Sequence, residues 1–368
     1  MIDSIGDNVL GCVTDNTPAN KKAWKELEQK YPNGFFHGCV FHGLNLLVKD
    51  IFAAKKKQPD GGGPAQYPIG YPFEYLVLFA ADCKDVVLFF YNHHVPMADL
   101  KKAFNSSKLG GLVHPAPTRW GTIQGCFKSL RAADNVLNGL VSQRDFVTTG
   151  NANQREKRAA IKAIITNPDF VTKLDECIKI LDPIDMFVKI FQSDAVPCSE
   201  VYNAFLYLED KMNELTNMDA DKKTYLVKLV RKRFDFMYGD AHGVAYLFDP
   251  RYLGDKMSRE LRKEVEDFVF NFPTPDGSTC KERMEKLAQE YTAFRIDALN
   301  EREQNGFRFK MIGNSKSVLQ WWMAASSAAS ERNFSTFGFI HSKLRNRLSP
   351  KKVKKLVYIK TNMLQMVD

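Results

Sequence analysis

The sequence predicts an α/β unit followed by a predominantly helical region, so the expected fold class is α/β plus α. Three observations support this. Two short apolar runs alternate with two helical patterns near the start, a segment rich in Gly, Pro and Lys follows, and helical periodicity then dominates. The expected divisions are an α/β part, a linker, a helical region and a terminal pair of helices, at 1–55, 56–71, 72–317 and 318–368.

The front of the chain alternates between strand and helix signals. The apolar run 8–14 predicts a buried strand that ends at an acidic turn, and apolar residues three and four apart predict a helix at 21–30. The run 34–38 predicts a second strand, and 39–52 predicts a helix with one apolar face. This order of strand, helix, strand and helix is an α/β pattern.

Helical periodicity dominates the remainder of the chain, and prolines separate or bend the pieces. Near the end, Ser349 and Pro350 supply an N-cap and a first helical position between two terminal helices, at 321–346 and 350–366. The clearest periodic segments before them are 74–91, 157–165, 170–191, 201–215, 222–236, 259–270 and 280–298.

Composition excludes several classes of protein. No apolar run reaches the roughly 20 residues that a membrane helix needs, so no membrane association is expected. Seven scattered cysteines and a start without a basic, cleavable signal indicate reduced thiols inside a cell. The excess of 52 Lys and Arg over 43 Asp and Glu, a net charge of +9, suits a polyanionic partner such as DNA.

An acidic residue follows the first predicted strand, in the motif Val13-Thr14-Asp15-Asn16. A carboxylate at the carboxyl end of a buried strand is a suitable ligand for Mg²⁺, which prefers oxygen donors. The structural alternative is that Asp15 opens a turn or caps the next helix.

Two further motifs carry potential chemistry. Cys39 and His42 form a C-x-x-H pair at a helix start, which resembles half of a zinc site, but the sequence offers no convincing second half, so a buried cysteine beside a cleft-lining histidine is the favoured interpretation. Arg119 and Trp120 follow two prolines and offer a phosphate ligand beside a stacking surface. The alternative for Trp120 is that it anchors its loop in the core.

The last motif is a stretch of small residues, 325–336, in which Glu331 is the only acid. Small side chains allow a neighbouring backbone to approach closely. An apolar stripe at helical spacing follows, and it forms either part of the core or a subunit interface. Its members are Phe337, Ile340, Leu344 and Leu348, with Val353, Leu356, Val357 and Ile359 continuing the apolar surface.

In their order and spacing these motifs resemble the hAT (hobo/Activator/Tam3) superfamily of DNA transposases. The front resembles the family's V-T-D-N, G-C and H-x-L-N-L block, the middle its T-R-W, and residues 326–348 its dimerisation segment. Shorter similarities occur at Leu181-Asp182-Pro183 and at 245–251. The resemblance covers nearly the whole chain.

The resemblance implies a partial RNase H-like core interrupted by a large all-helical insertion and closed by the C-terminal helices. In such cores three carboxylates hold two Mg²⁺ or Mn²⁺ ions for DNA cleavage and strand transfer. By position, Asp15 corresponds to the second carboxylate and Glu331 to the third. The resemblance also implies a nuclear protein.

The same resemblance implies contacts with DNA and with a second copy of the chain. Trp120 matches the tryptophan that stacks on a flipped base, and Arg119, His42 and Arg332 are the accompanying candidates for DNA binding. A homodimer or higher homo-oligomer is expected through the C-terminal segment, with Phe334, Phe337, Ile340, Leu344, Leu348 and Leu356 as the interface residues.

Two departures from the family pattern lower the expected activity. The family's first catalytic Asp and its N-terminal zinc finger precede the T-D-N block, whereas this sequence begins 14 residues before Asp15. Trp321 and Trp322 also join the terminal motif almost directly, as an internal deletion would leave them. We therefore expect a truncated and catalytically incomplete transposase-like protein. A non-catalytic regulator that dimerises and associates with DNA, and a zinc-bound regulator using Cys39 and His42, are the alternatives.

Overall fold

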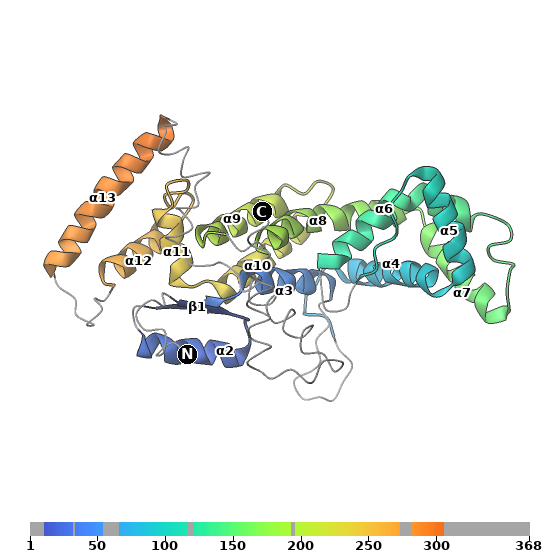
Figure 1. Ribbon diagram of the computed structural model, residues 1–368, viewed down its shortest axis with the longest axis horizontal. Helices are drawn as coiled ribbons and strands as arrows, with labels where there is room; N and C mark the ends of the chain where they lie inside the picture. Colours follow the sequence, from blue (N-terminus) through green and yellow to red (C-terminus); the bar gives the residue numbers. More distant parts are fainter. Residues whose placement is uncertain are drawn as a thin grey trace, which may run out of the picture. The chain divides into compact units, whose positions relative to one another are not determined.

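The computed structural model describes residues 11–31, 34–53, 66–115, 121–192, 196–272 and 281–304. In these residues the chain is mostly helical, with twelve helices and one two-stranded parallel sheet (Figure 1). This agrees with the expected combination of a small α/β part and a larger helical part. The chain divides into two compact units, which are described separately: Met1–Gly43, Lys189–Leu206 and Phe234–Asp368 form the first, and Leu44–Val188 and Tyr207–Arg233 form the second.

The first unit contains a β-α-β element. Strand β1 (Gly11–Thr14) is followed by helix α2 (Pro18–Lys30) and strand β2 (Phe35–Gly38), and the two strands pair in parallel, with Gly11 opposite Phe35 and Thr14 opposite Gly38. A parallel pair needs a crossover connection, which α2 provides. The first turn of helix α3 (Val40–Phe52) continues directly from β2.

Helix α2 begins three residues earlier than the periodicity predicts, at Pro18 rather than residue 21. The Thr17 side chain accepts a hydrogen bond from the backbone N–H of Asn20, and Pro18 occupies the first turn, where its missing N–H has no consequence. Capping therefore determines this boundary, because the first turn carries no large apolar side chain.

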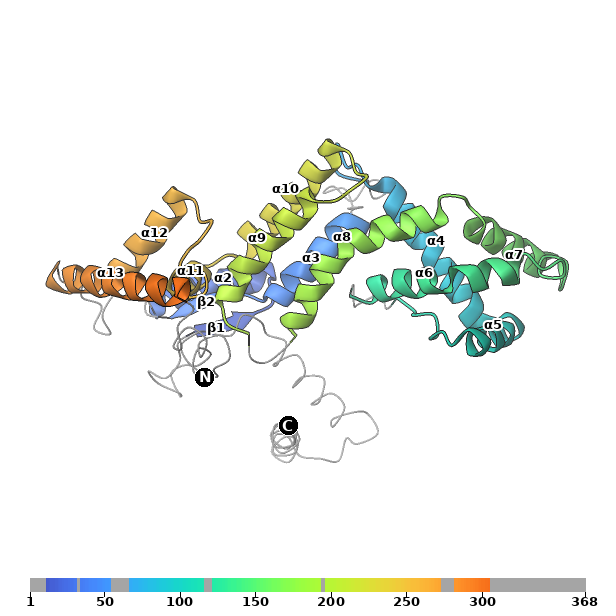
Figure 2. The ribbon, with the colours of Figure 1, turned by 90° about the horizontal axis from the view of Figure 1, so that it is seen from above.

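Three more helices of the first unit pack in sequence order. Helix α11 (Asp240–Phe248) contacts α12 (Arg259–Phe270), which contacts α13 (Lys281–Glu303), and Figure 2 shows these three together. Their core is formed by Leu247, Val265 and Tyr291, with partly buried apolar side chains around them. A second small cluster joins Cys198, Ala241 and Ala245, with Phe35 packed against it.

A buried ion network closes the end of α11. Asp249, whose side chain is 0% exposed, accepts hydrogen bonds from the Arg251 guanidinium and from Ser199 Oγ, at 2.6 Å and 2.7 Å for the shortest contacts. Arg251 also donates to Glu200, which accepts a second hydrogen bond from Tyr252. Burial acts to lower the pKa of Arg251, but the hydrogen bonds to Asp249 raise it by more. The guanidinium therefore stays charged.

The second unit is helical in its described residues. Helices α4 (Glu74–Asn92), α5 (His94–Ser107), α6 (Gly121–Val141) and α7 (Ala152–Ile165) pack on one another, and Figure 2 shows them grouped together. The core of the second unit is rich in Phe, and Phe73, Phe90, Phe127 and Phe170 are among its fully buried side chains.

The remaining helices α8 (Phe170–Ile190), α9 (Ser199–Asn213) and α10 (Ala220–Met237), like α3, contribute residues to both units. Within the second unit, Asp50 of α3 and Arg233 of α10 form a largely buried ion pair at 2.5 Å. Tyr75 of α4 donates a hydrogen bond to Glu176 of α8. Helix α8 continues through Pro183 without a break.

Most segments with clear helical periodicity are helices in the structure. The structure also contains α5, α6 and α11, which the periodicity did not predict. No helix in the described ranges combines the length and apolar character that crossing a bilayer requires. None of the six described cysteines forms a disulfide. The predicted linker falls largely outside the described residues, as do both terminal helices. Whether the core is RNase H-like stays a prediction.

Candidate functional site

The β-α-β element brings two of the sequence motifs to one edge of the sheet. Because the strands are parallel, Thr14 and Gly38 are the last residues of neighbouring strands, and the motifs that follow them start at the same edge. The Cys39 N–H donates a hydrogen bond of 2.6 Å to the Thr14 carbonyl, which extends the pairing to the first residue after β2. Asp15 and the C-x-x-H pair are therefore neighbours.

The buried Asn16 side chain links the residues that follow the two strands. It is 5% exposed, and its Nδ2 donates a hydrogen bond of 2.9 Å to the Cys39 carbonyl. Its Oδ1 lies against Gly38, where a Cβ atom would come within 1.5 Å of it. Trp24 of α2 adds a hydrogen bond from Nε1 to Thr14 Oγ1, at 2.9 Å. The buried Asn16 side chain therefore requires glycine at position 38.

Asp15 is partly exposed at the same edge. Its Oδ1 accepts hydrogen bonds from Asn20 Nδ2 at 2.6 Å and from the Thr17 N–H at 3.3 Å. Burial acts to raise the pKa of Asp15, but these hydrogen bonds and the charge of His42 outweigh it, so the pKa is lowered. The carboxylate is ionised at neutral pH, as a metal ligand must be, and it also opens the turn before α2.

The C-x-x-H residues divide into a buried and a partly exposed member. Cys39 is fully buried, in agreement with the inward-packing interpretation, whereas His42 is partly exposed and near enough to Asp15 to influence its pKa. Among the described residues, no group of three potential ligands that could hold a metal includes Cys39 or His42. The described residues therefore add no ligand to the Cys39 and His42 pair.

The other predicted site residues lie outside the described residues. These are the catalytic candidate Glu331, the DNA-binding candidates Arg119, Trp120 and Arg332, and the interface residues Phe334, Phe337, Ile340, Leu344, Leu348 and Leu356. Their predicted roles, and those of Asp15 and His42, stay predictions.

Sequence reasoning overlooked a second group of polar residues in the first unit. His37, Cys198 and His242 come together although they are widely separated along the chain, and no spacing motif links them. Buried His37 lies inside a predicted strand, where a polar side chain was the one available signal.

In its described residues the chain thus combines a parallel β-α-β element, which carries a carboxylate at its strand ends, with extensive helical structure. Residues 320–363 match the family model described as the hAT family C-terminal dimerisation region. This match confirms the resemblance to the hAT superfamily and shows that the chain carries a hAT-type dimerisation region. No curated protein sequence matches the chain.

Proposed function

We propose that this chain is a hAT transposase-like protein whose principal activity is self-association through its C-terminal segment. By descent it is related to enzymes that cleave DNA and transfer strands with the help of metal ions. The observation that carries the proposal is the match of residues 320–363 to a dimerisation region. The motifs at Asp15, His42 and Trp120, in the order expected for the family, support the extension to the rest of the chain.

The donor atoms at the sheet edge fit one part of a transposase metal centre. The Asp15 carboxylate has the oxygen donors that Mg²⁺ or Mn²⁺ prefers, and it is ionised. In the proposed ancestral site Asp15 and Glu331 would hold the ions, which activate a water or a 3′-hydroxyl when bound.

We propose further that this polypeptide does not cleave DNA by itself. A two-metal centre needs several carboxylates held in a fixed geometry. In the part of the chain that the structure describes, no group of three potential ligands that could hold a metal contains Asp15. The protein would then act as a dimerising, DNA-associated factor in the nucleus.

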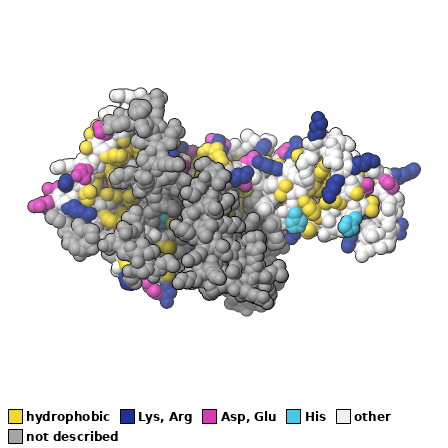
Figure 3. Space-filling model, viewed as in Figure 1, with side chains coloured by type: hydrophobic (Ala, Val, Ile, Leu, Met, Phe, Trp, Pro, Cys, Tyr) yellow, Lys and Arg dark blue, Asp and Glu magenta, His cyan; other side chains and the backbone are white. Residues whose placement is uncertain are grey.

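Positive charge supports the DNA-associated part of this proposal. The chain has a net charge of +9, which favours binding to a polyanion through release of counterions. Figure 3 shows Lys and Arg side chains at several places on the part formed by α4 to α7, among apolar and polar ones. Lys and Arg side chains neutralise phosphate groups, which is the sequence-independent part of DNA binding.

Replacing Phe334 or Leu344 by Asp is expected to convert the dimer into a monomer. A charge in the centre of an apolar interface must be desolvated without a partner, so the dissociation constant should rise at least tenfold. Light scattering coupled to size-exclusion chromatography over a concentration series measures this, as the mass falls toward that of one 42.0 kDa chain.

The matched control for this experiment is Leu78→Asp. Leu78 lies on α4, is 54% exposed and is outside the family match, so the same change there should leave the mass unaltered. A wild-type chain that remains monomeric at every concentration contradicts the proposed function. If neither substitution changes the mass of the oligomer, the subunit interface does not include Phe334 and Leu344.

Incubation of the wild-type chain with labelled hairpin-forming DNA and Mg²⁺ or Mn²⁺ is expected to give no cleavage above the metal-only background. The Asp15→Ala variant should behave identically, because the proposed site is incomplete. Binding to the same DNA should weaken steeply as salt rises. Robust cleavage that is lost in Asp15→Ala would show that the polypeptide is an active nuclease.

A further inference from the structure

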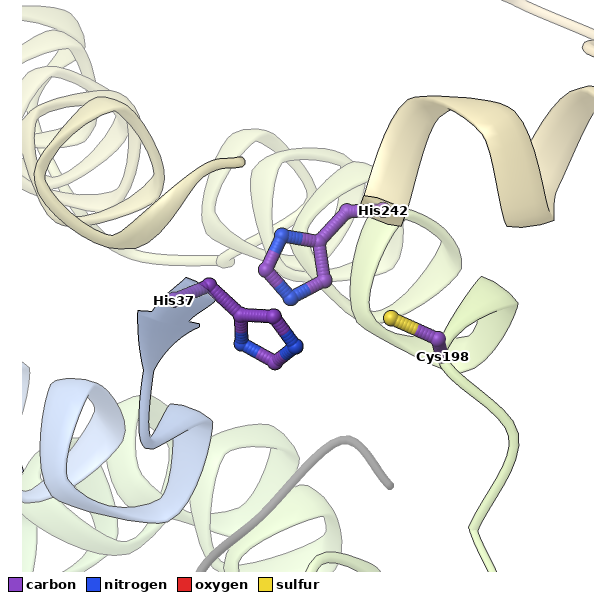
Figure 4. Close-up of side chains that lie close together, drawn as sticks. All are labelled: His37, Cys198 and His242. Atoms are coloured by element: carbon purple, nitrogen blue, oxygen red, sulfur yellow. The ribbon is translucent and has the colours of Figure 1, made fainter. Parts of the chain in front are cut away.

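Three buried side chains of the first unit converge on a common point. His37 comes from β2, Cys198 from the residue before α9, and His242 from the first turn of α11. Their ligand atoms all lie within 4.8 Å of one another. In Figure 4 the Nε2 edges of both imidazoles and the Cys198 sulfur face the same space.

The group is almost completely removed from solvent. His37, Cys198 and His242 are 2%, 1% and 0% exposed. The two imidazole rings meet edge to face, with their centroids 4.4 Å apart. The Nε2 atoms of His37 and His242 are buried and have no hydrogen-bond partner. Buried polar atoms without partners are rare and costly, so these two atoms require an explanation.

We propose that His37, Cys198 and His242 bind a Zn²⁺ ion. Two imidazole nitrogens and one thiolate form a donor set that favours zinc and differs from the oxygen donors preferred by Mg²⁺ or Mn²⁺. With ordinary zinc bond lengths, tetrahedral ligand atoms are separated by about 3.3–3.6 Å, so small side-chain movements complete the site. A water or another small ligand takes the fourth position. The site is distinct from the Asp15 edge.

The protonation states of the ligands are compatible with metal binding. Burial lowers the pKa of His37 to about 4 and lowers that of His242 as well, so both rings are neutral at physiological pH. Burial also raises the pKa of the Cys198 thiol. Zinc binding stabilises the thiolate, and the thiol proton is released to solvent.

The hydrogen bonds of the two Nδ1 atoms show which protonation change zinc binding requires. His37 Nδ1 lies 3.2 Å from the Gly38 carbonyl and can donate to it, which leaves the Nε2 lone pair facing the cluster. His242 Nδ1 instead accepts from the Gly239 N–H at 3.0 Å. A zinc-bound neutral His242 carries its proton on Nδ1, so this hydrogen bond is exchanged for the metal bond. One neutral hydrogen bond is small beside the free energy of a structural zinc site.

A surface cavity of the same unit borders the cluster. A cavity of about 530 Å³ between α2, β2 and the start of α11 is lined in part by His37, Gly239 and Asp240. It is lined by His37 and by the residues that precede His242, so it lies beside the proposed site. Zinc bound there would link three segments that are far apart in sequence, and so would stabilise the first unit.

The proposal is tested by metal analysis of the full chain, produced without a histidine tag in zinc-supplemented medium. About one zinc ion per chain is expected, with the melting temperature lowered by a chelator. His37→Gln and Cys198→Ser should each lower the zinc content at least tenfold and remove the sensitivity to chelator. Circular dichroism and elution volume report whether each variant is folded.

Two controls locate the site. Cys126→Ser removes an equally buried thiol of the second unit and should keep the zinc, and so should His42→Gln, which alters the C-x-x-H pair. If a ligand variant does not fold, X-ray absorption of the wild-type zinc protein identifies the atoms bound to the zinc. One sulfur with nitrogen neighbours supports the site, and an all-oxygen shell overturns it. Wild-type protein with no bound zinc, or zinc fully retained in Cys198→Ser, also overturns it. Neither result depends on dimerisation.

Discussion

Replacing Arg251 by Met is expected to lower the free energy of unfolding by about 3–5 kcal/mol, because it leaves a buried carboxylate without its cation. Asp249 is 0% exposed and accepts from Arg251 through both the side chain and the backbone N–H. Ser199 Oγ remains as a neutral donor, but it cannot balance the charge. Glu200 also loses its guanidinium partner in this variant.

The control is Arg131→Met, which removes an ion pair with Asp175 whose members are 43% and 42% exposed. Exposed pairs contribute at most about 1 kcal/mol, so this variant should stay near wild type. Urea unfolding followed by circular dichroism gives both values. Equal effects of the two substitutions would mean that the Asp249 network contributes no more than a surface pair.

Replacing Gly38 by Ala is expected to lower the free energy of unfolding by about 3 kcal/mol, from overpacking and a lost buried hydrogen bond. The added Cβ would lie 1.5 Å from Asn16 Oδ1, so the Asn16 side chain must leave its place. Its hydrogen bond to the Cys39 carbonyl is then broken, and the two strand ends separate. Thermal and urea unfolding of the variant measure the loss.

The control substitution is Gly139→Ala, an exposed position on α6 where a Cβ meets nothing within 4 Å. Alanine is favoured over glycine in a helix by about 1 kcal/mol, so the control should be neutral or stabilising. A double-mutant cycle with Asn16→Ala tests the cause, because the penalty at Gly38 should shrink once the amide is absent. An undiminished penalty in that background would exclude Asn16 as its source.

The agreement between sequence and structure is best where one physical signal dominates. Helix α12 was predicted with its observed bounds, because Leu261, Val265 and Phe268 repeat at helical spacing in a segment that begins at the N-cap Ser258. Helix α7 begins at Ala152 instead of residue 157, since the capping box of Asn151 and Gln154 starts it among polar residues. Helix α11 was not predicted, because nine residues provide too little periodicity.

In the candidate site, too, local motifs were predicted from the sequence, whereas contacts between distant segments were not. The T-D-N and C-x-x-H motifs were recognised as local patterns, and the parallel pairing of β1 with β2 places them at one edge. The role of Asp249 and Arg251 was missed, because the partners Ser199 and Glu200 lie about 50 positions away along the chain.

By itself the sequence determined the kinship with the hAT superfamily, the alternation of two strands and two helices at the front, and the terminal dimerisation region. Each of these is encoded by neighbouring residues, through periodicity, capping or a contiguous motif. The tertiary structure alone decided that His37, Cys198 and His242 share one buried point and that Gly38 must lack a side chain. The physical reason is that burial and short-range contacts between distant segments depend on packing, which leaves no trace in local spacing.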